Sequence, residues 1–230
     1  MRPIIEYLST KVANTKIKAT DETIYKIVKD ELDRLGHNAD LNHIDVSKVT
    51  DMNNLFNCES DLILGSTYKD LNPDISKWNV SNVKDMTAMF LECENFNQDL
   101  SHWDVNNVKT MNSMFSSCKK FNQDISGWDI GNVEDTHFMF FMCEKFNCDI
   151  SGWNVSNVKD MECMFTGCEN FDCDISKWDV RNVKDMTGMF HNCKKFNQDL
   201  SQWDIKNVKY HNSIFLRCPI KEEFKPNFVN

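Results

Sequence analysis

Two series of acidic residues recur every 25 residues in this chain of 230, and each would form a row of carboxylates if the copies stack. The first series is invariantly aspartate and is predicted to lie in turns, where a carboxylate accepts backbone N–H bonds. The second series mixes aspartate and asparagine between inward-pointing apolar residues, so it should face outward and could bind calcium or a basic ligand. Calcium requires about six or more oxygens, and the calcium-binding repeats of β-helices are glycine-rich and shorter. We therefore favour a structural role for the first series and a ligand-binding face for the second. The first series is Asp74, Asp99, Asp124, Asp149, Asp174 and Asp199, and the second is Asn79, Asp104, Asp129, Asn154, Asp179 and Asp204.

The ten cysteines offer a second possible chemistry. Six of them recur every 25 residues on an apolar stripe and are predicted to be small buried hydrophobes. Cys148 and Cys173 occupy one position in neighbouring copies, so a disulfide between them is possible. Together with Cys143 and Cys168 they form two pairs, and four thiolates could hold zinc. Free thiols are the favoured interpretation, no cofactor is expected, and so many unpaired cysteines fit a reducing compartment. The six recurring cysteines are Cys93, Cys118, Cys143, Cys168, Cys193 and Cys218.

Catalytic signatures are not evident in the sequence. The six histidines are scattered, and the recurring serines suggest a structural row rather than a single nucleophile. The sequence contains no glycine-rich phosphate loop, no HExxH and no GxSxG. We expect a protein that is not an enzyme.

A 25-residue repeat must position all these residues. Its copies begin at unit position 1 with Leu71, Phe96, Phe121, Phe146, Phe171 and Phe196. The apolar residues at unit positions 8 and 10 lie two apart, as in a strand, and those at 13, 16, 19, 20 and 23 have helical spacing. Asparagine at unit position 12 would be the helix N-cap. The sequence therefore predicts an α/β fold: a leucine-rich-repeat-like solenoid of about seven strand–helix coils, with a parallel sheet on one face, short helices on the other and an N-terminal helical cap.

The repeat suggests three segments. Residues 1–36 do not repeat, and they carry helical patterns over Ile4–Val12 and about Asp21–Leu35, so they are predicted to form the N-terminal helical cap. Residues 37–220 would form the solenoid of seven units, of which the first, near His37, is degenerate. Residues 221–230 would form a C-terminal cap.

Charge limits the class of partner. The net charge of −9 and the pI near 5.1 argue against nucleic acid or an anionic membrane. No segment is long and apolar enough to span a bilayer. No secretory signal or anchor is visible, so the compartment stays undetermined between the cytoplasm and export by a non-Sec route.

The units resemble a known repeat. FNQDISGWDIGNVEDTHFMFFMC and FDCDISKWDVRNVKDMTGMFHNC resemble the bacterial surface-protein repeat that is labelled BspA-like and related to leucine-rich repeats. The opening ADLNHIDVSKVTDMNNLF and the ending CPIKEEFKPNF resemble the first and last parts of such arrays. The resemblance covers residues 37–228 and implies a leucine-rich-repeat-type solenoid without catalytic activity, with roles in adhesion or protein recognition.

The residues that vary between copies carry the functional hypothesis. Unit positions 7 and 11 change from copy to copy within a nearly fixed framework. A constant scaffold that displays changing residues is what a binding surface requires, although drift at unconstrained surface sites gives the same pattern. We expect a recognition module for a protein or glycan. The alternatives are a structural spacer or end-to-end self-assembling solenoid, monomeric or weakly oligomeric, and a metal-binding protein. The candidate binding residues are Lys77, Asn79, His102, Asp104, Asp129, Asn154, Lys177, Asp179, Arg181 and Asp204.

Overall fold

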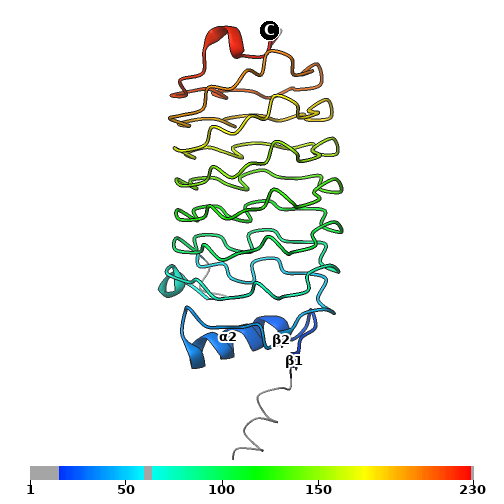
Figure 1. Cartoon of the computed structure of the whole chain (residues 1–230), viewed down its shortest axis with the longest axis vertical. Coiled ribbons are helices and arrows are strands. Elements are labelled where there is room, and N and C mark those ends of the chain that lie inside the picture. The colour runs from blue at the N-terminus through cyan, green and yellow to red at the C-terminus, as the bar shows by residue number, and fades with distance from the viewer. Residues whose placement is uncertain (1–15, 60–63, 229–230) are drawn as a thin grey trace, which may run out of the picture.

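The structure is a computed structural model that describes residues 16–59 and 64–228. Successive 25-residue units form coils that lie one above another along the long axis of the molecule (Figure 1). Helix α2, Ile24–Leu35, lies at the N-terminal end of this stack. The C-terminal residues lie at the opposite end. The described chain therefore forms a column of coils covered by one helix at its first coil.

The regular elements are few and lie mainly at the ends. Strand β1, Ile17–Lys18, pairs in parallel with β2, Ile44–Asp45. Two short 3-10 helices follow, η1 at Ser66–Tyr68 and η2 at Glu222–Phe224. Within the described residues no helix is long and apolar enough to cross a membrane.

The predicted α/β solenoid of seven strand–helix coils is wrong. The described residues contain one α-helix and one two-stranded sheet, and the parallel sheet and the row of helices expected along the repeats are not formed. Neighbouring coils meet instead at isolated parallel bridges, such as those joining Asp135 to Thr110 and to Asp160. The coils consist of consecutive turns.

Left-handed backbone at two positions of each of the six regular units is the physical reason that no helix forms. An α-helix needs negative φ throughout, whereas unit positions 18 and 22 have φ between 51° and 74°. The helical spacing of apolar residues therefore reflects turns, in which the amide of Phe165 donates to the carbonyl of Met189 in the next coil at 3.0 Å. Residues with this conformation at the two positions include Ala88, Glu92, Ser113, Ser117, Phe138, Met142, Cys163, Gly167, Gly188, Asn192, Ser213 and Arg217.

The predicted N-cap asparagines have a different role. Asn157 Nδ2 donates to the carbonyl of Gly131 in the preceding coil at 2.6 Å, and Asn182 Nδ2 donates to that of Ser156 at 2.7 Å. The same bond recurs at Asn82, Asn107, Asn132 and Asn207. Side-chain amides thus replace the strand ladder on this side of the coil.

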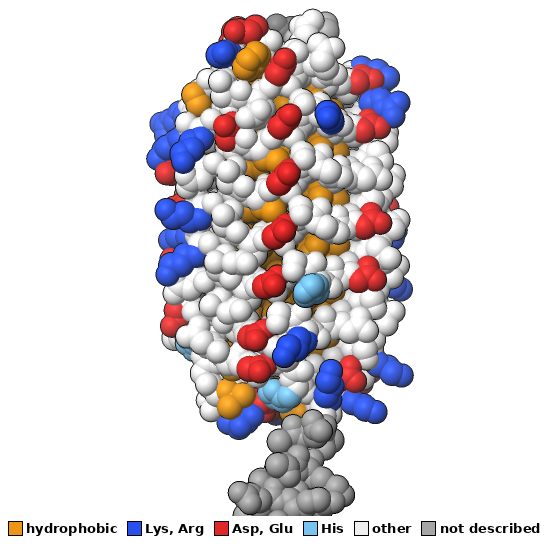
Figure 2. Space-filling view, in the orientation of Figure 1, with side chains coloured by type: hydrophobic (Ala, Val, Ile, Leu, Met, Phe, Trp, Pro, Cys, Tyr) orange, Lys and Arg blue, Asp and Glu red, His pale blue; other side chains and the backbone are white. Residues whose placement is uncertain are grey.

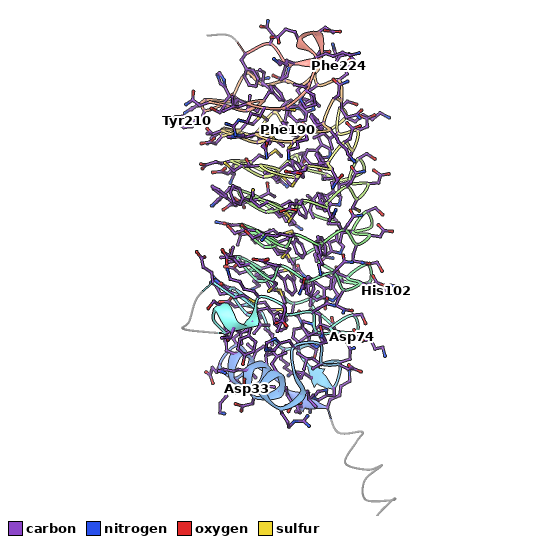
Figure 3. The ribbon with its side chains drawn as sticks, turned by 90° about the vertical axis from the view of Figure 1, so that its left-hand side faces the viewer. Asp33, Asp74, His102, Phe190, Tyr210 and Phe224 are labelled. Atoms are coloured by element: carbon purple, nitrogen blue, oxygen red, sulfur yellow. The ribbon has the colours of Figure 1, made fainter. Side chains whose placement is uncertain are left out.

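The apolar positions fill one continuous core, as their types predict. Trp103, Met114 and Phe115 are at most 3% exposed, and the equivalent residues of the neighbouring coils are buried with them. Phenylalanine rings stack from coil to coil, with Phe115 and Phe140 at 5.7 Å between centroids and nearly parallel. Phe190 belongs to this row and lies in the interior of the column (Figure 3).

The helix predicted from about Asp21 to Leu35 is observed as α2, which begins at Ile24. Its buried residues are Ile24, Val28 and Leu32, and Tyr25 Oη donates to the carbonyl of Asn53 in the first coil at 2.6 Å. The helical pattern over Ile4–Val12 lies outside the described residues.

Candidate binding face

The first aspartate series stabilises turns, as predicted. Asp124 Oδ1 accepts the amide of Ser126 at 3.0 Å, and Asp149 makes the same bond with Ser151. Hydrogen bonds from the hydroxyl and amide of Ser126 lower the pKa of Asp124. This series is therefore part of the framework and stays ionised at neutral pH.

The second series lies on the surface but also closes turns. Asp129 Oδ1 accepts the amide of Gly131 at 3.0 Å, and Asp104 Oδ1 accepts that of Asn106 at 3.2 Å. One carboxylate oxygen of each is thus used locally, and the side chains remain exposed. Asn79, Asn154, Asp179 and Asp204 make equivalent bonds.

Cations neutralise part of this series near the C-terminal end. Arg181 pairs with Asp179 at 2.6 Å, and Lys206 pairs with Asp204 at 2.9 Å. Asp104 and Asp129 have Asn106 and Gly131 at the corresponding places, and they make no ion pair among the described residues. Acidic side chains lie in columns along the long axis on the side seen in Figure 2. Because Asp179 and Asp204 are paired, the negative charge of the second series is least neutralised in the middle coils.

The side chains at unit position 7 differ in size from coil to coil, and this determines the shape of the face. Lys77, His102 and Lys177 are exposed, and their side chains make no hydrogen bond among the described residues. Between His102 and Lys177 the chain has Gly127 and Gly152, whose missing side chains leave open space within 4 Å. Figure 3 shows His102 at the outer edge of the coils, opposite Tyr210. The face therefore lacks side chains at unit position 7 in two consecutive coils, and His102 and Lys177 lie on either side of this gap.

A groove of about 550 Å³ opens beside Gly152. Its lining contains three aspartates and one lysine, Lys177. A smaller groove of about 260 Å³ includes Lys77, His102 and Asp104. We define the variable face as unit positions 7, 9 and 11 with the groove at Gly152. The candidate binding residues all lie on it. The sequence analysis did not single out the groove-lining Asn147 and Asp172, and it gave Asp174 a structural role only; the consecutive glycines could have indicated the groove.

The cysteines do not come together as a metal site. Cys143 and Cys168 are buried, and their thiols donate to the carbonyls of Phe115 and Phe140. Burial raises the pKa of both thiols. Cys148 and Cys173 are free thiols that contact the amides of Ile125 and Ile150. No group of three or more His, Cys, Asp or Glu side chains within residues 16–59 and 64–228 is arranged to hold a metal ion.

A titratable cluster absent from the sequence analysis lies on another side of the coils. His137 Nδ1 contacts Asp135 Oδ1 at 2.8 Å, and this hydrogen bond raises the pKa of His137. In the next coil, burial raises the pKa of Asp160 and of Glu162. The 25-residue spacing of Asp135 and Asp160 could have predicted that these carboxylates lie in neighbouring coils.

The fold defines a repeat protein built from stacked 25-residue coils of turns. The chain belongs to the family described as "Mycoplasma protein of unknown function, DUF285", whose model matches residues 28–149 and 124–227. Comparison with curated proteins and with solved structures found no match.

Proposed function

We propose that this protein is a non-catalytic binding module that recognises a protein or glycan through the variable face. The main observation is that exposed or half-buried residues change from coil to coil at unit positions 7 and 11, while most of the surrounding polar side chains are constant and hydrogen-bonded within the fold. Repeat scaffolds display ligand-binding residues in this way.

Among the described residues, some polar side chains of the variable face are hydrogen-bonded within the fold, whereas others are not. Asn147 Oδ1 accepts the amide of Asp172 at 2.8 Å, and Asp174 Oδ1 accepts that of Ser176 at 3.0 Å, so both are needed for the coil. Lys177 and His102 have no such bond among the described residues. Their chemical types are therefore free to serve an external ligand.

The charge of the protein and the shape of the variable face limit the chemical class of the partner. The net charge of −9 and the aspartates around the groove at Gly152 disfavour nucleic acid and favour a partner with hydrogen-bond donors or basic groups. The resemblance of the units to the BspA-like repeat supports a role in adhesion or protein recognition.

Site-specific photo-crosslinking tests the proposal. A photoreactive residue replaces Gly152, where the structure has room for a side chain, and a second protein carries the same residue in place of Lys145, an exposed residue at unit position 25. Both proteins are irradiated in soluble and envelope fractions of the source organism. We expect a discrete adduct from position 152 and none from position 145.

Competition establishes specificity. Excess unmodified protein should abolish the adduct, and excess Gly152→Lys protein should not, because the lysine fills the groove. Asn95→Lys is the matched competitor, since unit position 25 naturally holds lysine at residues 120, 145 and 195, and it should compete like the native protein. No adduct at position 152, or equal adducts at both positions, would overturn the proposal.

A further inference from the structure

In the second half of each unit before the last, four backbone amides donate hydrogen bonds in one direction between coils. At unit positions 16, 18, 20 and 22 the amides donate to carbonyls of the following coil, as Met161 does to Asp185 at 3.0 Å and Cys163 to Thr187 at 2.8 Å. The amides at positions 19, 21 and 23 close turns within their own coil instead. Each coil therefore presents a row of N–H donors toward the C-terminal end.

In the part of the chain that the structure describes, no further coil follows the last one to accept these bonds. The amides of His211, Ser213, Phe215 and Arg217, which occupy positions 16, 18, 20 and 22, have no hydrogen-bond partner among the described residues. Their counterparts Met186, Gly188, Phe190 and Asn192 are all bonded. Unpaired backbone groups in such a row form a template for another chain.

Apolar groups surround this row of donors. Tyr210 and Leu216 are 58% and 50% exposed, the two highest values among the large hydrophobic residues described as exposed. Tyr210 projects from the edge of the terminal coil (Figure 3). In the preceding coil the same unit positions hold the polar residues Asp185 and His191.

An open pocket lies beside the row. It has a volume of about 300 Å³, and Trp203, Ile205, Val208, His211 and Phe228 are among its lining residues. Val180 and Val183, the counterparts of Ile205 and Val208 in the preceding coil, are at most 1% exposed. The tail residues after Ile220 also contact this coil: Leu200 donates to the carbonyl of Phe224 at 2.8 Å, and the ring of Phe228 stacks on that of His211 at 4.3 Å between centroids. The lining also contains the polar residues Asp204, Lys206 and Asn227, and the apolar part of the pocket is surface that a following coil would bury.

We propose that the C-terminal end of the stack binds a polypeptide segment from another protein that has the conformation of the second half of a repeat unit. Such a segment presents carbonyls at alternate residues to the four free amides, as Asp185, Thr187 and Met189 do inside the column. Side chains like Met186 and Phe190 would cover the apolar surface of the last coil. The partner is therefore a chain with a repeat of this type whose first coil is not covered by a helix.

A second copy of this chain does not fit as the occupant. Its own first coil is covered by α2, whose Tyr25 already donates to the carbonyl of Asn53. Two C-terminal ends cannot pair either, because N–H donors would face N–H donors. Both ends of the chain thus exclude simple self-assembly through this row.

A peptide titration tests this docking site. The probe has the sequence of residues 184–193 with serine at the position of Cys193, because this segment covers the equivalent row two coils earlier. The peptide is added to the ¹⁵N-labelled full chain, and the chemical shifts and hydrogen-exchange rates of the backbone amides are measured. We expect saturable shifts at the amides of His211, Ser213, Phe215 and Arg217, with at least tenfold slower exchange of these amides in the complex.

Matched variants keep the test interpretable. Val208→Lys places a charge in the pocket and should weaken peptide binding at least tenfold, and Ser156→Lys adds the same charge on the variable face and should leave it unchanged. Native shifts of Trp203 in Val208→Lys would confirm that the last coil is intact; if they are lost, Leu216→Lys at the exposed rim replaces that variant. Slow exchange of the four amides in the free protein, no saturable shift, or a concentration-dependent dimer through this end would overturn the proposal. The pocket shares Asp204 and Lys206 with the variable face, but the photo-crosslinking experiment probes Gly152 two coils earlier, so the two outcomes are distinguishable.

Discussion

The indole nitrogen of Trp153 donates to the backbone carbonyl of Ile125 at 3.1 Å across a sequence separation of 28 residues. The same bond joins Trp128 to Leu100 at 3.0 Å and Trp178 to Ile150 at 3.1 Å. Each tryptophan is therefore both core bulk and a link to the coil before it. The fixed spacing of tryptophans in the sequence is the spacing of these links.

Removing one such link should destabilise the column without emptying the core. Trp128→Phe keeps an aromatic ring but leaves the buried carbonyl of Leu100 without its indole donor, at an expected cost of about 1–3 kcal/mol in the free energy of unfolding. Urea denaturation followed by far-ultraviolet circular dichroism measures this. Gly127→Ala next to it should be within about 0.5 kcal/mol of the native protein, since no atom lies within 4 Å of the added methyl. Equal midpoints for Trp128→Phe and the native protein would contradict the assigned link.

Asparagines at unit position 2 form a second set of links between coils. Asn122 accepts the amide of Asn147 at 2.7 Å and donates its own amide to Asn97 at 2.9 Å. Asn122→Leu should cost about 1 kcal/mol, because the amide of Asn147 loses its acceptor. Asn122→Asp should retain most of the stability, as Asp172 fills this role naturally by accepting the amide of Asn197. Thermal melts of both variants provide the comparison, and equal losses would contradict the acceptor role.

Acid should unfold the column through the first aspartate series. Bonds from the paired serines lower the pKa of Asp124, Asp149 and Asp174. Because these folded-state pKa values lie below the unfolded value of about 3.9, the stabilisation is present above that pH and is lost as pH falls through the folded-state pKa. The melting temperature is expected to fall steeply below about pH 4. Asp124→Asn should flatten that fall slightly, and an unchanged profile in a variant carrying three such substitutions would count against this cause.

His137 should give the stability of the protein the opposite pH dependence. Its folded-state pKa is raised by Asp135, so its stabilisation is full below the unfolded pKa of about 6.5 and is lost as pH rises through the folded-state pKa. His137→Asn, which copies Asn112 at the same unit position, should melt lower than the native protein at pH 5.5 and equally at pH 9. A difference in melting temperature that does not depend on pH would show that the imidazolium–carboxylate pair is not the cause.

The sequence predicted the period, the buried tryptophans and the turn role of Asp124, because these depend on residue type and spacing alone. It did not predict that Asn157 bonds a neighbouring coil, since an asparagine before an apolar stripe has the same pattern as an N-cap. It also did not predict the left-handed backbone at Cys163 and Phe138, which are unusual residues for positive φ. Contacts with the next coil impose that conformation, and a pattern of apolar spacing contains no information about it. The groove at Gly152 was not predicted either, because its shape depends on how neighbouring coils align.

The most direct test of the central claim compares Gly152→Lys with Asn95→Lys for binding of the partner captured at position 152. Both variants add one lysine at an exposed or half-buried place, so their unfolding midpoints should match that of the native protein. We predict that Gly152→Lys weakens partner binding at least tenfold and that Asn95→Lys leaves it unchanged. Unchanged binding by Gly152→Lys, with its fold intact, would show that the variable face is not the recognition surface.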